Sequence, residues 1–255
     1  MRGWYWLWWM SSRHRRCMTW IRTSCRTLSW CRTVCFQIRE VSLSKAAQVM
    51  KIDSRKPEKG VVDKVLTLLS GGGVVVCPTE TRYGLLARAD GEETVEKVYR
   101  IKDRDRDKPI SIFIPHAGFL RYYAVSTPIA QRLAALYLPG PLTLVLDVLE
   151  GARVPVAREG KVGIRISGSP VIAAIVERAD YPITATSANI SGQPIPVTID
   201  QARQQLGDRV DLYVDGGPLE EPESTVVDCS DGCTVLREGS IPRQQIEAIA
   251  QEARA

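Results

Sequence analysis

The stretch that decides the fold is residues 71–87, GGGVVVCPTETRYGLLA. Three glycines end a preceding amphipathic segment, and the three valines that follow favour a buried strand. Pro78 is predicted to end this strand. The polar turn that follows carries Thr79, Glu80 and Thr81 at the carboxyl end of the strand, where α/β sheets usually bind their ligands. An ordinary strand-to-loop exit with solvated side chains is the alternative interpretation.

The composition is that of a soluble globular protein, with 255 residues, 44% hydrophobic and 25% charged. The net charge of +5 is unevenly distributed along the chain. Residues 1–49 hold nine basic residues and one acidic residue, so the other 206 residues carry a net charge of −3. The charge of the main body therefore argues against a general surface for binding polyanions.

Residues 1–49 are not typical of a folded domain. All six tryptophans lie here, without helical or strand periodicity, and the apolar run 4–10 is far too short to span a bilayer. We predict an unstructured leader over 1–49 and one domain over 50–255, with no membrane segment. An early start codon, with Met50 as the true start, and an organellar targeting segment are the two interpretations of the leader.

Cysteine and histidine usage restricts the chemistry. The domain holds Cys77, Cys229 and Cys233, an odd number at irregular spacing, which favours a reducing compartment and predicts a cytoplasmic protein. The last two flank a predicted turn, which is a simpler interpretation than half of a metal site. The two histidines, His14 and His116, argue against a histidine-built metal site or a Ser-His-Asp triad. We predict no metal held by protein side chains.

Apolar periodicity predicts alternating helices and strands after residue 57. Helices are expected up to Gly71, over 92–101, 128–137 and 170–178, up to Leu206, and from Pro242. Strands are expected over 74–77, 85–89, 110–114, 142–146, 162–166 and 183–185, with an edge strand over 211–214 and a hairpin formed by 225–228 and 234–237. This order predicts one α/β domain on a twisted, mixed sheet with flanking helices.

Two polar motifs are candidates for binding an anion. Lys102 and Arg104 follow a helix and precede an apolar strand, where a phosphate clamp would be held rigidly. Arg106 is expected on the solvated side of the same loop. Ser187 and Asn189 belong to the turn TSANISG, whose backbone N–H groups could form an anion-binding nest.

Three further residues extend this set. Arg165 lies inside the apolar strand VGIRI, where a buried guanidinium needs a carboxylate or a phosphate. A structural ion pair and a substrate carboxylate are both possible partners. Ser224 and Arg237 repeat the pattern of hydroxyl and cation on the last hairpin.

The motifs PTETRYGL, KDRDRDKP, PGPLTLVL, VGIRI, TSANISG, STVVD and VLREGSI occur in an order and spacing that resemble the YrdC-like family of threonylcarbamoyl-AMP synthases. The resemblance extends over residues 59–241. It implies a single YrdC-like domain with a large concave cavity. It also implies synthesis of threonylcarbamoyl-AMP from L-threonine, bicarbonate and ATP with release of pyrophosphate, and downstream tRNA threonylcarbamoyl transferase proteins that use the product.

The resemblance also implies roles for individual residues. Threonine contacts fall on Thr81, Arg165 and Ser224. Nucleotide contacts fall on Lys102, Arg104, Lys108, Ser187, Asn189 and Arg237. Of these, Lys102 and Arg104 would be catalytic, with Mg²⁺ accompanying the ATP.

Two positions depart from the family pattern. Phe113 stands where many members have a histidine, and Arg82 stands where a small apolar residue is usual. A paralogue with a different substrate is therefore one alternative. The other is a module that binds tRNA or double-stranded RNA, against which the acidic domain and the lack of aromatic stacking motifs argue.

Overall fold

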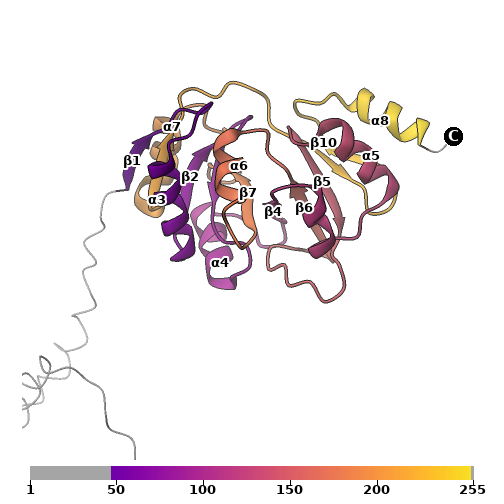
Figure 1. Ribbon diagram of the computed structural model, residues 1–255, viewed down its shortest axis with the longest axis horizontal. Helices are drawn as coiled ribbons and strands as arrows, with labels where there is room; N and C mark the ends of the chain where they lie inside the picture. The colour runs from indigo at the N-terminus through magenta and orange to yellow at the C-terminus, as the bar shows by residue number, and fades with distance from the viewer. Residues whose placement is uncertain (1–46, 254–255) are drawn as a thin grey trace, which may run out of the picture. The chain divides into compact units, whose positions relative to one another are not determined.

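The computed structural model describes residues 47–253, which form a ten-stranded sheet with flanking helices (Figure 1). The strands are β1 (Gln48–Lys51), β2 (Val75–Pro78), β3 (Tyr83–Leu86), β4 (Ser111–Phe113), β5 (Leu142–Asp147), β6 (Lys161–Arg165), β7 (Ile183–Ser187), β8 (Leu212–Asp215), β9 (Thr225–Asp228) and β10 (Thr234–Arg237). The helices are α3 (Lys59–Ser70), α4 (Glu92–Ile101), η1 (Ala117–Tyr122), α5 (Pro128–Tyr137), α6 (Pro170–Val176), α7 (Ile199–Leu206), η2 (Gly207–Arg209) and α8 (Arg243–Glu252).

The sheet is mixed, as predicted, with the strand order β1-β8-β2-β3-β7-β4-β6-β5-β9-β10. Strands β2, β3, β7 and β4 pair antiparallel in the middle. Parallel pairs join β1 to β8, β8 to β2, β4 to β6 and β5 to β9. Parallel neighbours need crossover connections, which place strands that are distant in the sequence side by side in the sheet.

The first strand corrects two predictions. Gln48 and Val49, assigned to the leader, belong to β1 and pair with Leu212 and Tyr213 of β8. Because β1 occupies the outer position, β8 is an interior strand, and its prediction as an edge strand was wrong. The rest of the predicted leader, 1–46, lies outside the described residues.

The two strands predicted within and after the stretch 71–87 pair as a hairpin. Strand β3 begins at Tyr83, two residues earlier than predicted, and pairs antiparallel with β2. In the connecting loop the Thr79 hydroxyl accepts hydrogen bonds from the backbone N–H groups of Thr81 and Arg82 and donates to the carbonyl of Arg82. One side chain thus satisfies three polar backbone groups of a tight loop.

One face of the sheet is covered by α3 and α6. In α3 the buried residues include Val61, Val65 and Leu69 at helical spacing, and they pack with Val75 of β2 and Leu212 of β8. The opposite face carries the larger core cluster, to which α4, α5, α7 and α8 contribute. Helix α5 begins as predicted at Thr127, whose hydroxyl caps it by accepting from the N–H of Ala130.

Candidate active site

Side-chain alternation along four neighbouring strands creates a cavity. Ile112, Leu144, Ile164 and Val227 of β4, β5, β6 and β9 point into the larger core. The residues that alternate with them face the other way and line a cavity of about 280 Å³. These cavity-facing residues are Ser111, Phe113, Thr143, Val145, Gly163, Arg165 and Val226.

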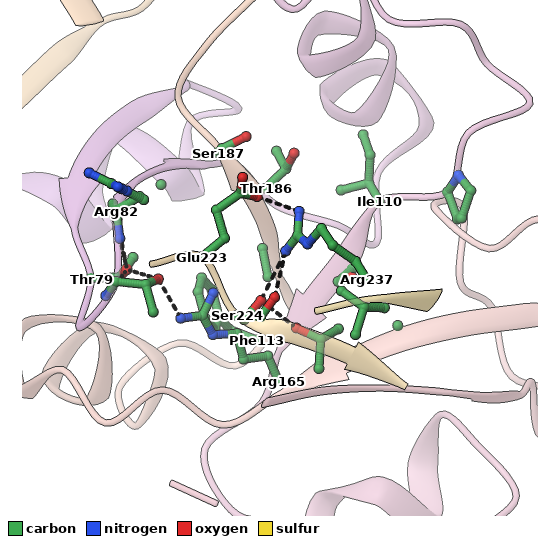
Figure 2. Close-up of a pocket in the computed structure, with 18 of the residues that line it drawn as sticks. Thr79, Arg82, Ile110, Phe113, Arg165, Thr186, Ser187, Glu223, Ser224 and Arg237 are labelled. Atoms are coloured by element: carbon green, nitrogen blue, oxygen red, sulfur yellow. Dashed lines mark hydrogen bonds and ion pairs between the residues drawn. The ribbon is translucent and has the colours of Figure 1, made fainter. Parts of the chain in front are cut away.

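The cavity is strongly cationic, although the domain as a whole is acidic. Among the described residues that line it are four arginines, Arg82, Arg104, Arg165 and Arg237, and a single carboxylate, Glu223. Hydroxyl groups complete the polar lining, from Thr79, Thr81, Ser111, Thr143, Thr186, Ser187 and Ser224 (Figure 2). A concave site with this charge is suited to an anionic ligand.

Arg165 ends β6 and is 8% exposed. Its Nη2 donates to Glu80 Oε1 at 2.7 Å and to Thr81 Oγ1 at 2.8 Å, and the guanidinium lies 5.6 Å from the centre of the Phe113 ring. Its Nε is buried and has no hydrogen-bond partner within the described part of the chain. The structural ion pair is therefore present, and one N–H of the same guanidinium is left unsatisfied by the described residues.

Sequence analysis did not assign a role to Glu80 or Ser167. Glu80 pairs with Arg165 and also accepts a hydrogen bond from the Ser167 hydroxyl, which in turn accepts from the N–H of Ser169. The signal was available, because Glu80 belongs to the polar turn after β2. The sheet order separates β2 and β6 by three strands, so the contact of this turn with Arg165 becomes visible only from the side-chain geometry.

The hairpin β9–β10 contributes a second cationic group (Figure 2). Arg237 Nη2 donates to the carbonyl of Ser224 at 2.9 Å and to its hydroxyl at 3.2 Å, while Nη1 is paired with Glu223. The Ser224 hydroxyl also lies 3.1 Å from the hydroxyl of Thr143. Ser224 and Arg237, predicted from separate motifs, thus form one hydrogen-bonded unit.

Arg104 supplies a third guanidinium on the loop after α4. Its Nη2 donates to the carbonyl of Pro109 at 2.9 Å, which holds the side chain along its own loop. Burial lowers the pKa of Arg104, and the positive charge of Arg237 lowers it further. Two guanidinium groups whose positive charges repel each other across a cavity favour the binding of an anion between them.

Lys102 lies behind the cavity wall rather than in it. It is 1% exposed, and its Nζ donates to the carbonyls of Ser187 and Asn189 and to Asn189 Oδ1. Burial lowers the pKa of Lys102 to about 7, with a smaller contribution from Arg104. The structure therefore gives this lysine a direct contact with the turn 187–189, including the lining residue Ser187, while Lys102 itself does not line the cavity.

In the turn TSANISG, predicted as a nest of N–H groups, at least two of these groups are bonded within the protein. The N–H of Ile190 donates to Gln205 Oε1, and the N–H of Ser191 donates to the carbonyl of Lys102. Asn189 is buried and accepts from the Ser187 hydroxyl at 2.6 Å. The turn is held by its own side chains, and the residues it presents to the cavity are Thr186 and Ser187.

The structure brings together around one cavity most of the residues that the sequence motifs singled out. These are Thr81, Arg104, Arg165, Ser187, Ser224 and Arg237. Lys102, Asn189 and Lys108 are not among the lining residues; the first two are buried behind the wall and Lys108 is exposed. The two departures from the family pattern, Arg82 and Phe113, also line the cavity.

No group of three or more His, Cys, Asp or Glu side chains within 47–253 is arranged to hold a metal ion. In the same residues, no helix combines the length and the apolar character that crossing a membrane requires.

Comparisons with known proteins agree with this geometry. A family model described as "Telomere recombination", which is named after the Sua5, YciO and YrdC proteins, matches residues 67–239. The putative threonylcarbamoyl-AMP synthase of Methanocaldococcus jannaschii is 34% identical over 205 residues, which are 80% of this chain and 97% of that protein. The threonylcarbamoyl-AMP synthase of Bacillus subtilis is 37% identical over 193 residues, which are 74% of this chain and 56% of that protein.

A solved structure extends the similarity to three dimensions. The crystal structure of P. abyssi Sua5 complexed with L-threonine superposes with a TM-score of 0.74 at 31% identity, covering 79% of this chain and 60% of that one. The chain thus spans nearly all of the M. jannaschii relative and less than two thirds of the other two. Since the family model matches more than half of the sequence, the chain belongs to the Sua5/YciO/YrdC family.

Proposed function

We propose that the protein synthesises threonylcarbamoyl-AMP from L-threonine, bicarbonate and ATP. The observation that carries the proposal is the meeting of three arginines, Arg104, Arg165 and Arg237, in one cavity, with a free donor on Arg165. Relatives of similar sequence bear the name of this synthase, and the solved relative was crystallised with L-threonine.

In this reaction the threonine amine and bicarbonate form a carbamate with loss of water. An oxygen of the carbamate attacks the α-phosphorus of ATP, the bond from that phosphorus to the bridging oxygen breaks, and pyrophosphate leaves with the electron pair. Such a transfer needs in-line positioning and cationic stabilisation rather than a protein nucleophile. A cavity lined by guanidinium and hydroxyl groups supplies both.

The two substrates would use different parts of the lining. The threonine carboxylate would accept from Arg165 Nε, beside Thr81, with Ser224 across the cavity. The nucleotide phosphates would lie on Arg104, Arg237 and Ser187. A guanidinium can hold a carboxylate or phosphate through two parallel hydrogen bonds, which suits both assignments.

Of the three predicted residues outside the lining, two receive indirect roles. Lys102 and Asn189 would position the turn that presents Ser187, through the hydrogen bonds from Lys102 Nζ. Lys108 remains a nucleotide contact only by the family pattern. Magnesium would enter as part of the substrate MgATP, because Mg²⁺ at phosphates keeps several waters and needs few protein ligands.

The test is release of pyrophosphate by the full chain from ATP and bicarbonate with each amino acid in turn. We expect release that depends on threonine. Release with another amino acid would indicate a paralogue with a different substrate, in line with Phe113 and Arg82. No release with any amino acid, together with tight binding of duplex RNA, would replace the enzyme by an RNA-binding module.

The product would be passed to tRNA threonylcarbamoyl transferase proteins in the cytoplasm. A reducing compartment is supported by the odd number of cysteines in the domain and by their irregular spacing.

A further inference from the structure

Glu223 lies in an unexpected place for a carboxylate. It belongs to the segment that connects β8 to β9, and among the described residues that line the cavity it is the sole acidic side chain. Its carboxylate is paired with Arg237 Nη1, and the side chains of Arg237 and Glu223 are 46% and 33% exposed (Figure 2). A carboxylate therefore already occupies one of the cations proposed to bind phosphate.

The surroundings of Glu223 are otherwise positive. The positive charge of Arg237 lowers the pKa of Arg104. The positive charge of Arg104 lowers the pKa of buried Lys102, whereas the negative charge of Glu223 raises it. In the cavity without a ligand, Glu223 is thus the group that offsets a cluster of like charges. A nucleotide phosphate would make the same pairing with Arg237 and would be repelled by Glu223.

Arg237 contacts Glu223 and Ser224 through different nitrogens, so the contact with Glu223 can be lost while the contacts with Ser224 remain. Its Nη2 is fixed by two hydrogen bonds to Ser224, at 2.9 and 3.2 Å, whereas its Nη1 contacts Glu223. Loss of the Glu223 contact would leave the guanidinium in place. The partial exposure of Glu223 gives its carboxylate access to solvent when it is displaced.

We propose that Glu223 is an internal counter-anion that pairs with Arg237 in the empty cavity and is displaced by a phosphate group of the bound nucleotide. It thereby sets nucleotide affinity and favours ligands whose phosphate chain carries enough charge to replace it. The identification of the ligand as ATP rests on the proposed function. The exchange itself rests only on the pairing at Arg237.

The test compares E223Q with E221Q by calorimetric binding of adenosine, AMP, ADP and ATP, without threonine or bicarbonate. Glu221 is exposed on the same segment and is not a lining residue, so E221Q removes the same charge without touching Arg237. A partly exposed ion pair and one repulsive charge predict about fivefold tighter binding of ATP by E223Q. The gain should shrink from ATP to AMP and vanish for adenosine, and E221Q should match the natural protein.

Three results would overturn the proposal: an unchanged affinity in E223Q, a weaker affinity, or an equal gain for adenosine and ATP. A gain that rises with phosphate number in a protein that releases no pyrophosphate with any amino acid would keep the counter-anion and refute the synthase. Threonine-dependent release with no gain in E223Q would do the reverse. Failure of both the natural protein and E223Q to bind ATP would refute both.

Discussion

Arg104 and Arg106 are two positions apart on one loop but meet different surroundings. Arg104 lines the cavity, whereas Arg106 is paired with Glu96 and its side chain is 69% exposed. If Arg104 stabilises charge that develops on the phosphates, Arg104→Ala should lower kcat/KM by about 10²- to 10³-fold. Arg106→Ala should change it by less than about twofold, because exposed ion pairs contribute little.

Steady-state kinetics with varied ATP, together with melting temperatures of both variants, would check this. Equal losses at the two positions would mean that the loop acts as a diffuse patch of charge, contrary to the assignment of Arg104.

Lys102 predicts a pH dependence of stability. Burial holds its pKa at about 7 in the folded protein, against an ordinary value of 10.5. Between these values the unfolded chain binds the proton more tightly, so the free energy of unfolding should rise as pH increases. Relative to Lys102→Met, the natural protein should gain about 2 kcal/mol between pH 7 and pH 9, since one pKa unit corresponds to about 1.4 kcal/mol.

Urea unfolding of both proteins at pH 7, 8 and 9 measures this difference and cancels the titration of other groups. A difference that stays constant or falls across the range would show that the three acceptors around Nζ keep Lys102 charged in the folded state.

At the scale of elements, the hairpin β9–β10 is held close to the segment that carries Glu223 and Ser224. A Cβ added at Gly239 would lie 2.1 Å from the carbonyl oxygen of Glu223 and 2.7 Å from the carbonyl carbon of Ser224. These are backbone atoms that cannot rotate away. Gly239→Ala should therefore destabilise the fold by about 1–3 kcal/mol, as overpacking does, and should weaken ATP binding by moving Ser224.

Gly60 in α3 provides the control, because a Cβ there would meet nothing within 4 Å. Gly60→Ala should leave ATP binding unchanged and raise stability by up to about 1 kcal/mol, the helix preference of alanine over glycine. Denaturant midpoints and calorimetric affinities would contradict the argument if Gly239→Ala matched Gly60→Ala.

Most elements could be predicted from the sequence, because helical periodicity and valine-rich runs are local signals. Helices 92–101 and 128–137 have the predicted ends. Strand β1 could not be predicted: its residues QVMK have no alternation, and its pairing depends on β8. The same limit applied to the site, where motifs identified Arg165 and Arg237 but not their partners Glu80 and Glu223, since both partners lie in loops whose paths the sequence pattern does not determine.

The position of β1 predicts where the chain can be shortened. Deleting residues 1–46 leaves β1 intact, and we expect no change in melting temperature or activity. Deleting residues 1–51 removes a strand that pairs along four residues with β8, so the backbone groups of β8 on that side lose their hydrogen-bond partners. That variant should melt several degrees lower, because each kcal/mol lost shifts the midpoint by about 2–4 °C in a domain of this size.

Thermal unfolding followed by circular dichroism would compare the two truncations. Equal melting temperatures would show that β1 contributes nothing to the sheet. A lower value for the shorter deletion would show that residues within 1–46 stabilise the domain.

The place of β1 beside β8 also fixes an order of events while the protein is being made. The N–H of Ala47, immediately before this strand, donates to Asp208 Oδ1, 161 residues further along the chain. At about 5–20 residues per second, the ribosome needs roughly 10 to 30 seconds to deliver that partner. Throughout this interval β1 lacks its partner β8, so its edge is open to pairing with another strand.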